Sequence, residues 1–405
     1  MMHTCNLCGS KNLLPLINFG SHPISHHFLK DGQQDNYVHS VDLQFCEDCG
    51  LTQIVNPVPP EKFYTQLFAL SSWKYQPHIP HEIDLIRRLP GISADSRIVE
   101  IASNDGTFCK ALHEAGYHSV IGIEPAIDAQ RVARERGVET IGAYFDTDTA
   151  KQFVEKYGKA NLVIARQVLE HIPDLGEIQR ALKIILASDG HVLLEVPDFA
   201  MNLQTSDYSI WEEHVNQFTL ETLKYFTEGV GLQVNHSETI VYSGQGIILI
   251  ASNSDNPVDQ KKTDLSDLCN ANFRFKENWP FMRQSFIDYL QKCKSEGGKI
   301  AIYGAGARVC TLVNYAGLTP YVDCFVDDQV EKQGLFMPGS HLPILPSSRL
   351  YSEGITLCLL AVNTENEDRV LTNHKTWIDN GGKFYSIFPP SNRLLPIWEK
   401  SANHA

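Results

Sequence analysis

The sequence lacks any apolar run long enough to cross a membrane. Stretches such as residues 355–362 fall far short of the roughly 20 apolar residues that a spanning helix needs. Near the N-terminus there is also no basic start followed by an apolar core, which is the mark of a signal peptide. We therefore expect a cytoplasmic protein with no membrane partner.

Basic residues are scarce as well. The chain has 34 Lys and Arg against 48 Asp and Glu, for a formal net charge of −14. Because affinity for a nucleic-acid backbone comes mostly from clustered Lys and Arg, this balance argues against a nucleic-acid partner and favours a small-molecule substrate. Internal repeats and low-complexity tracts are missing too, which argues against a solenoid or a propeller.

The 405 residues, 43% of them hydrophobic, suffice for two or three packed cores. From Arg97 onward, short apolar runs alternate with segments of helical period, a pattern typical of βαβ units and a mostly parallel sheet. We expect helices at 108–115, 177–186 and 220–228. Seven strands are predicted, at 98–101, 119–123, 139–141, 161–165, 191–196, 233–236 and 246–251.

A second α/β unit follows a polar stretch in which residues 273–293 have helical character. Its predicted strands are 299–303, 322–326 and 355–361, with helices at 308–315 and 370–380. The pattern thus predicts four parts, namely a metal-binding module (1–75), a first α/β domain (76–255), a helical connector (256–298) and a Rossmann-like domain (299–405).

Two cysteine pairs stand near the N-terminus, Cys5 with Cys8 and Cys46 with Cys49, each followed by glycine. A tetrahedral zinc needs four soft donors at about 2.3 Å, and two such knuckles supply them. Four cysteines leave no open position for water, so the predicted Zn²⁺ is structural. The long gap between the knuckles predicts an inserted hairpin built from residues 13–16 and 38–45. The alternative is two chance pairs of reduced cysteines.

A candidate cofactor turn follows the first strand of the first α/β domain. Such a turn brings backbone close to a ligand at a helix N-terminus, although two of the customary glycines are replaced here. About 20 residues later, Glu124 ends the next strand, where a carboxylate can accept both ribose hydroxyl protons. Adenosine binding is therefore expected. The candidate cofactor-binding residues are Glu100, Ala102, Asn104, Asp105, Gly106 and Glu124.

Two alternatives to this cofactor site stay open. A nicotinamide dinucleotide uses similar geometry, but the third glycine that accommodates a pyrophosphate is missing. The other alternative is an α/β domain that binds no cofactor. After the fourth strand, however, the run Val168-Leu-Glu-His171-Ile-Pro-Asp174 resembles the strand-end motif of class I methyltransferases. That resemblance implies S-adenosylmethionine as the cofactor.

Taken together, the motifs resemble the family of sugar C-methyltransferases, which act on nucleotide-linked deoxysugars carrying a keto group. The resemblance covers nearly the whole chain and rests on several segments in one order: the two knuckles with residues 50–53, the turn 100–106, Trp211-Glu-Glu-His214, the turn 303–306, and residues 326–341. It implies a class I, Rossmann-like, seven-stranded methyltransferase domain, a small zinc module, and a second Rossmann-like domain that serves no second cofactor. It also implies methylation of the carbon beside the ketone, with a histidine as base.

The chemistry of carbon methylation also requires a base, independently of the family resemblance. A carbon beside a carbonyl becomes a nucleophile only when a base removes its proton and a donor stabilises the resulting oxygen charge. His214, preceded by Glu213, is our candidate base, and His171 is the candidate donor. Trp211 is a candidate substrate contact. The alternative for each histidine is a structural role, such as ordering the loop after the fourth strand.

The chain also departs from the family pattern. Trp211-Glu212-Glu213-His214 stands where Tyr-His-Glu-His is common, and Gly244-Gln245-Gly246 replaces a Gly-Gly-Ser turn. A family tyrosine that reaches the site corresponds to Tyr64 or Tyr75, near Ser71 and Ser72, and the sequence does not choose between them.

In the second α/β unit, Gly304, Gly306 and Arg308 open a helix after a strand. Backbone amides, the helix dipole and Arg308 are candidates to hold the diphosphate of a nucleotide-linked sugar, although the family usually has Lys at this last position. A purely structural turn is the alternative. Two other functions also stay open, O- or N-methylation of a sugar or related small metabolite, and a non-catalytic zinc-ribbon binding scaffold.

Overall fold

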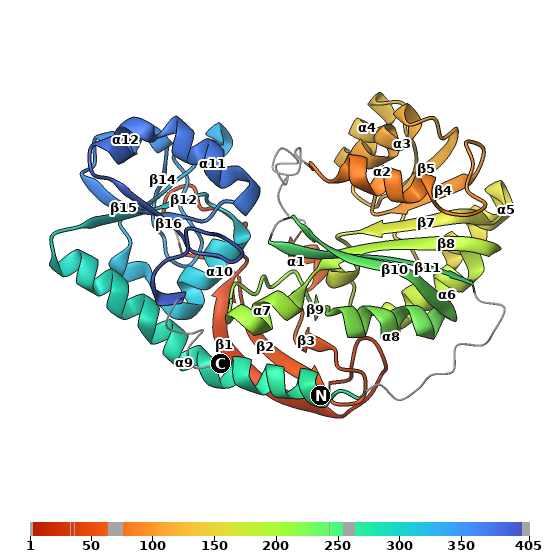
Figure 1. Cartoon of the computed structure of the whole chain (residues 1–405), viewed down its shortest axis with the longest axis horizontal. Coiled ribbons are helices and arrows are strands. Elements are labelled where there is room, and N and C mark those ends of the chain that lie inside the picture. The colour runs from red at the N-terminus through yellow and green to blue at the C-terminus, as the bar shows by residue number, and fades with distance from the viewer. Residues whose placement is uncertain are drawn as a thin grey trace.

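The computed structural model describes residues 3–32, 34–35, 37–63, 76–242, 244–253 and 264–398. Two α/β domains lie side by side, and the N-terminal strands lie between them along their lower side (Figure 1). Tyr64, Tyr75, Ser71 and Ser72 lie outside the described residues.

The N-terminal zinc module (residues 3–63) is built on an antiparallel pair, β1 (Leu13–Pro23) and β2 (Val38–Cys46), which confirms the hairpin expected between the knuckles. A short β3 (Thr52–Ile54) pairs with β2, and α1 (Pro60–Phe63) follows. The fourth strand of this sheet, β9 (Asn216–Gln217), comes from far along the chain, directly after the segment that carries His214. The sequence did not predict β9, because two residues show no alternation.

The first α/β domain contains the predicted seven-stranded sheet, in the order β10-β11-β8-β7-β4-β5-β6. Its strands are parallel except β11, which runs antiparallel to both β8 and β10. The bounds are β4 (Arg97–Ile101), β5 (Ser119–Ile123), β6 (Glu139–Ile141), β7 (Ala160–Arg166), β8 (Leu186–Pro197), β10 (Leu232–Val241) and β11 (Gln245–Asn253).

Helices cover both faces of this sheet because each carries an apolar stripe. Ile86, Phe108 and Leu112 pack on one face, and Phe153 and Phe226 pack on the other, together with Cys5 and Leu51 of the zinc module. Side-chain caps at Asp146 and Asp174 fix the starts of two helices. The helices are α2 (Ile79–Arg87), α3 (Thr107–Glu114), α4 (Ile127–Glu135), α5 (Thr147–Tyr157), η2 (Leu169–His171), α6 (Leu175–Ile185), α7 (Phe199–Thr205) and α8 (Leu220–Val230).

The C-terminal domain has a five-stranded, all-parallel sheet in the order β14-β13-β12-β15-β16. Three of these strands were predicted, whereas the short β14 and β16 were missed, and the helix expected at 370–380 is divided at His374 into α11 and α12. The bounds are β12 (Lys299–Tyr303), α10 (Ala307–Ala316), η3 (Thr319–Tyr321), β13 (Cys324–Val326), η4 (Val330–Lys332), β14 (Ile344–Leu345), η5 (Ser347–Tyr351), β15 (Ile355–Leu360), α11 (Thr364–Asn373), α12 (Lys375–Asp379) and β16 (Lys383–Ser386).

A 30-residue helix, α9 (Ser266–Ser295), connects the zinc module to the C-terminal domain (Figure 1). It continues through Pro280, because buried side chains on either side of the proline, among them Phe275 and Phe286, anchor both halves in one hydrophobic core. In the same core, the Phe19 ring lies 5.4 Å from Trp279 and 4.4 Å from Tyr315. Among the described residues, no helix is long and apolar enough to span a membrane.

Candidate active site

The four predicted zinc ligands come together. Cys5 Sγ lies 3.5 Å from Cys49 Sγ, Cys8 Sγ lies 3.6 Å from Cys46 Sγ, and all four sulfurs fall within 4.8 Å of one another. Tetrahedral zinc with bonds of about 2.3 Å would place its sulfurs roughly 3.8 Å apart, so the donor set and its spacing fit a closed Zn²⁺ site. With no free position for water, this metal stabilises structure rather than performing chemistry.

The predicted cofactor turn joins β4 to α3 at the carboxyl edge of the first sheet. Ala102, Asn104 and Gly106 have φ values of 53°, 51° and 73°, so the two residues that replace customary glycines also adopt the left-handed conformation. For a residue other than glycine this region costs about 1–2 kcal/mol. A Cβ at Gly106 would lie 3.0 Å from that of Ala133, so only glycine fits there. The turn therefore holds strained backbone where a ligand must approach closely.

Glu124 follows β5 at the same edge and reaches back to the turn. Its Oε2 accepts the N–H of Asn104 at 2.9 Å, and its Oε1 accepts the N–H of Ala126 at 2.8 Å. Burial raises the pKa of this carboxyl. Each oxygen retains a lone pair for a hydroxyl, and Asn104 Oδ1 is buried with no hydrogen-bond partner among the described residues. These free acceptors fit the ribose of an adenosine cofactor.

Glu100 and Asp105, also predicted to bind the cofactor, are engaged by the protein. The Glu100 carboxylate is buried, accepts the Cys109 thiol at 3.1 Å, and has a pKa raised to about 7 by burial. Asp105 accepts the N–H of Thr107 and pairs with Arg136 at 2.8 Å. Both carboxylates therefore hold the turn and the start of α3 in shape, and these contacts give no support to a direct role in binding.

Sequence reasoning missed a buried ion cluster behind this turn. Arg166, the last residue of β7, lies 2.9 Å from Glu82 of α2 and 2.9 Å from Glu195 of β8, and His78 lies 3.3 Å from Glu195. The one sign of this cluster in the sequence is an arginine at the end of an otherwise mostly apolar strand. Its partners lie far apart in the sequence, so their identity could not be read from it. The cluster fixes the carboxyl ends of these strands against α2.

His171 and His214 come together at the carboxyl edge that carries the cofactor turn. His171 ends η2, which follows β7, and His214 lies in the segment between α7 and β9, here called loop 206–215. Their ring centroids are 4.8 Å apart, and Trp211 lies 4.7 Å from His214 and 5.7 Å from His171. One oxygen of Glu170 and one nitrogen of each histidine fall within 4.8 Å of one another. Three titratable groups therefore share one small volume.

Hydrogen bonding fixes the tautomer of His171. Its Nδ1 lies 3.1 Å from the carbonyl oxygen of Glu213, and since a carbonyl only accepts, Nδ1 carries the proton. Burial lowers the pKa of His171 to about 4, so near neutral pH its Nε2 presents a lone pair. Glu170 Oε1 lies 4.0 Å from that Nε2, and burial raises the pKa of this carboxyl well above its usual range.

His214 is half-buried, so its ring is not enclosed in the interior. Burial, and then the charges of His171 and Arg308, lower its pKa well below the usual value for histidine. The ring is therefore neutral near pH 7 and free to accept a proton. The Glu213 carboxylate, 3.9 Å from His171 Nδ1, is half-buried beside the pair.

Glu212, the residue that departs from the family pattern, turns away from this pair toward the zinc module. Its Oε1 accepts both the N–H of Ser25 at 2.7 Å and the hydroxyl of Ser25 at 2.8 Å. The side chain is 1% exposed, and burial raises its pKa to about 7. The additional carboxylate thus connects loop 206–215 to the zinc module through hydrogen bonds.

Arg308 reaches from α10 to loop 206–215. Its Nη2 lies 2.9 Å from Asp207 Oδ2, its Nε donates to Ser209 Oγ at 3.2 Å, and the guanidinium covers the Phe388 ring at 4.3 Å. A Cβ at Gly244 would lie 3.5 Å from Arg308 Nη1, so the predicted 244–246 turn is close by. The structure therefore places Arg308 against the loop that carries His214.

The backbone of the Gly304–Gly306 turn is hydrogen-bonded to side chains of the C-terminal domain itself. Asp327, after β13, accepts the N–H of Ala305 at 2.8 Å, and Lys332 Nζ donates to the carbonyl of Ala305 at 2.9 Å. Lys332 also lies 3.4 Å from Asp327. These contacts favour the structural alternative for this turn over a phosphate site.

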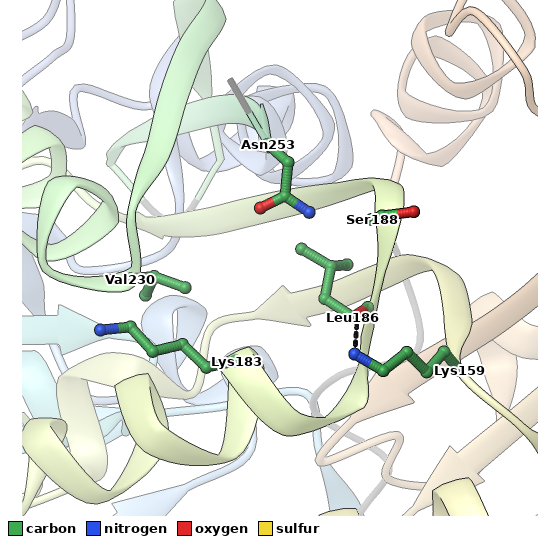
Figure 2. A pocket seen from close by; sticks show the side chains of 6 residues that line it. All are labelled: Lys159, Lys183, Leu186, Ser188, Val230 and Asn253. Atoms are coloured by element: carbon green, nitrogen blue, oxygen red, sulfur yellow. Dashed lines mark hydrogen bonds between the residues drawn. The ribbon is translucent and has the colours of Figure 1, made fainter. Parts of the chain in front are cut away.

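A separate surface pocket lies at the opposite edge of the first sheet (Figure 2). Lys159 precedes β7, Leu186 begins β8 and Asn253 ends the antiparallel β11, so this edge carries the amino ends of the parallel strands. In parallel α/β sheets, ligands bind at the carboxyl edge. The pocket is therefore not part of the candidate active site.

Comparison with family models divides the chain into three consecutive matches. Residues 5–64 match a model described as "Putative zinc binding domain", residues 74–237 match "Methyltransferase domain", and residues 260–389 match "C-methyltransferase C-terminal domain". Among curated proteins, the chain is similar to C-methyltransferase NovU of Streptomyces niveus, with 28% identity over 402 residues that cover 95% of each protein.

Two further similarities each cover less than half of the chain. The ubiquinone biosynthesis O-methyltransferase of Bordetella avium is 26% identical over 136 residues, which are 33% of this chain and 52% of that protein. A solved S-adenosylmethionine-dependent methyltransferase from Anabaena variabilis aligns with 45% of this chain and 87% of its own, at 16% identity and a TM-score of 0.38. The three family matches and the full-length relative show that the chain is an S-adenosylmethionine-dependent C-methyltransferase like NovU, in which matches to a zinc-binding domain, a methyltransferase domain and a C-methyltransferase C-terminal domain follow one another.

Proposed function

We propose that this enzyme methylates the carbon beside the ketone of a nucleotide-linked keto-deoxysugar. The observation that carries the proposal is the pair His171 and His214, whose rings lie 4.8 Å apart at the edge that carries the cofactor turn. Carbon methylation next to a ketone needs two groups that handle protons, one at the carbon and one at the oxygen. The relative NovU, itself described as a C-methyltransferase, supports the same chemistry.

S-adenosylmethionine, when bound, supplies an electrophilic methyl group. Glu124 would accept the ribose hydroxyls, and the strained backbone at Ala102, Asn104 and Gly106 would lie against the ligand. Glu100 and Asp105 keep that backbone in place from behind.

His214 is the proposed base. It would take the proton from the carbon beside the ketone, which leaves a negative charge on the substrate oxygen and a positive charge on the imidazole. Because its pKa lies well below the usual histidine value, the ring is ready to accept a proton throughout the neutral range. A positioned base contributes about 10²–10⁴ in rate.

His171 is the proposed donor to the substrate oxygen. Its Nδ1–H is committed to the Glu213 carbonyl, so only a ring that is also protonated at Nε2 can donate to the substrate. Burial disfavours the charged form of both His171 and Glu170, so the donor form arises when the proton of the Glu170 carboxyl passes to Nε2, 4.0 Å away, and leaves a carboxylate that stabilises the protonated ring. One such donor is worth roughly 2.7–4 kcal/mol of transition-state stabilisation.

For the substrate, Trp211 and Arg308 are the proposed contacts. Arg308 is a cation beside loop 206–215 in a strongly acidic chain, which suits the diphosphate of a nucleotide-linked sugar. Trp211 offers an aromatic surface next to both histidines. Gly304 and Gly306 would act by placing the start of α10, which carries Arg308, rather than by holding phosphate.

A second candidate is O- or N-methylation of a sugar or related metabolite, favoured by the similarity of 33% of the chain to an O-methyltransferase. Product NMR after incubation with labelled cofactor and a panel of nucleotide-linked 4-ketosugars separates the two. We expect a new methyl signal attached to a ring carbon. A methoxy or N-methyl signal would contradict the proposal.

A further inference from the structure

The zinc module and the segment that carries His214 share one sheet. Gln53 and Thr52 of β3 pair with Asn216 and Gln217 of β9, and the N–H of Ile54 donates to the carbonyl of Val215 at 2.9 Å. Figure 1 shows β9 and α7 lying between the catalytic sheet and the N-terminal strands. Loop 206–215 therefore ends in a strand that belongs to the zinc module's own sheet.

The first zinc knuckle contacts this strand directly. Asn6, between Cys5 and Cys8, donates from its side chain to Asn216 Oδ1 at 2.9 Å. The backbone N–H of Asn6 donates to Gln53 Oε1 at 2.8 Å, and Gln53 Nε2 donates to the carbonyl of Thr4 at 3.0 Å. Asn6 is thus held by the knuckle on one side and by β3 on the other, so its side chain has a fixed direction.

Asn216 in turn contacts η2, the turn that carries His171. Its Nδ2 donates to the carbonyl of Leu169 at 2.9 Å and to that of Ile172 at 2.8 Å, one on each side of His171. The Asn216 side chain is 1% exposed, and its amide oxygen and both amide hydrogens are used. The neighbouring Gln217 donates from Nε2 to the carbonyl of His214 at 2.6 Å. One two-residue strand therefore holds the backbone at both histidines.

The zinc module also contacts loop 206–215 just before His214 in the sequence, through the hydrogen bonds between Ser25 and Glu212. The segment from 212 to 217 is consequently fixed at two points by residues of the zinc module. A closed four-cysteine zinc site is a rigid anchor for such contacts, because the metal fixes the backbone of both knuckles.

We propose that Asn216 and Asn6 are positioning residues, through which the zinc knuckle sets the distance and orientation between His171 and His214. The proposal rests on the proposed function in that it takes these two histidines as the catalytic pair. The zinc site then serves catalysis although the metal touches no reacting atom. Displacement of one reacting group by about 1 Å can cost 10²-fold in rate, so a small shift of either backbone segment is sufficient.

The test compares Asn6→Ala and Asn216→Ala with Asn272→Ala. Asn272 is a matched control, because it is as buried as Asn216 and also connects the zinc module to another element, accepting from Thr52 and donating to Leu268 within α9. Within the described part of the chain, its side chain makes no hydrogen bond to η2 or β9. All three variants are assayed for zinc content, S-adenosylmethionine affinity, kcat and KM.

We expect Asn216→Ala to lower kcat about 10²-fold and Asn6→Ala about tenfold, with one zinc retained and cofactor affinity within threefold. The ¹⁵N NMR signals of the His171 and His214 rings should shift in both variants and stay in place in Asn272→Ala. Those ring signals need no substrate, so they test the positioning claim even if the methylated product turns out to be different. Unchanged kcat and unchanged ring signals in Asn6→Ala and Asn216→Ala, or an equal loss in Asn272→Ala, would overturn the proposal.

Discussion

The mostly parallel sheet of the first α/β domain and the parallel sheet of the C-terminal domain each place a tight turn and an acidic residue at the same topological position, but these groups make different contacts in the two domains. In the catalytic domain, Glu124 accepts the backbone N–H of Asn104 and keeps further lone pairs. In the C-terminal domain, Asp327 accepts the N–H of Ala305 and is also paired with Lys332, which in turn bonds the turn's own carbonyl. One turn is open to a ligand, and the other is closed by a lysine of its own domain.

The other carboxyls near these edges differ in how fully they are partnered. Glu170 and Glu212 each have an oxygen without a hydrogen-bond partner among the described residues, and burial raises both pKa values. In the C-terminal domain, Asp328 accepts the hydroxyls of Tyr303 and Ser347. Glu365 Oε2 and Glu367 Oε1 of the C-terminal domain are likewise buried with no hydrogen-bond partner among the described residues, so free carboxylate oxygens alone do not separate the two domains, and the distinction rests on the two turns.

The largest expected effect concerns the open turn. Glu124→Ala should weaken S-adenosylmethionine binding about 10²-fold or more, because two hydrogen bonds to a charged group, each worth about 1.5–3 kcal/mol, are lost. Calorimetric titration measures it. Asp327→Ala is the matched change in the closed turn and should leave cofactor affinity within twofold. Equal losses in both variants would remove the distinction between the turns.

A second effect concerns the buried Glu212. Its folded pKa of about 7 lies above the unfolded value of about 4.3, so its contribution to stability is complete below the unfolded pKa and is lost as pH rises through 7. Glu212→Gln keeps an acceptor for Ser25 without a buried charge. It should be more stable than the wild type by about 3 kcal/mol at pH 8, with little difference at pH 4. Denaturant unfolding at both pH values measures this, with the exposed Glu155→Gln as control. A difference that does not depend on pH would contradict the assignment.

Lys332→Ala should open the closed turn and leave the buried Asp327 without its cation. We expect a loss of about 1–3 kcal/mol in unfolding free energy, the penalty for a buried group that loses a partner. Cofactor affinity should not change. A large change in S-adenosylmethionine binding in this variant would show that the C-terminal turn takes part in cofactor recognition after all.

The smallest effect distinguishes the two turns by backbone strain. Ala102 has a positive φ, so Ala102→Gly should stabilise the protein by about 0.5–1 kcal/mol, after the entropy that glycine adds to the unfolded chain is subtracted. Ala305, in the closed turn, is not in the left-handed region, so Ala305→Gly should destabilise by about 0.5–1 kcal/mol or more. Thermal unfolding of both variants tests the opposite signs.

Much of the fold could be predicted because it rests on local patterns. The seven strands show as short apolar runs between helical segments, and the zinc site shows as two knuckles of fixed spacing. Ala102 and Asn104 could be recognised as turn residues because they stand where a strand passes into a helix. The short strands β9 and β14, of two residues each, carry no periodicity and could not be predicted.

The part of the site that could not be predicted from the sequence depends on contacts between residues far apart in the chain. The Arg166 cluster brings together residues from α2, β7 and β8, and the Ser25–Glu212 and Asn6–Asn216 pairs span 187 and 210 positions of the chain. Hydrophobic period and motif spacing contain no information about such polar partners. His171 was predicted as a donor, but its tautomer became evident only when the carbonyl of Glu213 was found beside Nδ1.

The central claim is that His214 removes a proton from the carbon beside the substrate's ketone. Solvent deuterium exchange at that carbon, followed by NMR in the presence of S-adenosylhomocysteine, tests it without methyl transfer. The account predicts exchange with the wild type and a loss of about 10²–10⁴ in its rate with a folded, zinc-loaded His214→Asn variant. Normal exchange in that variant would contradict the claim.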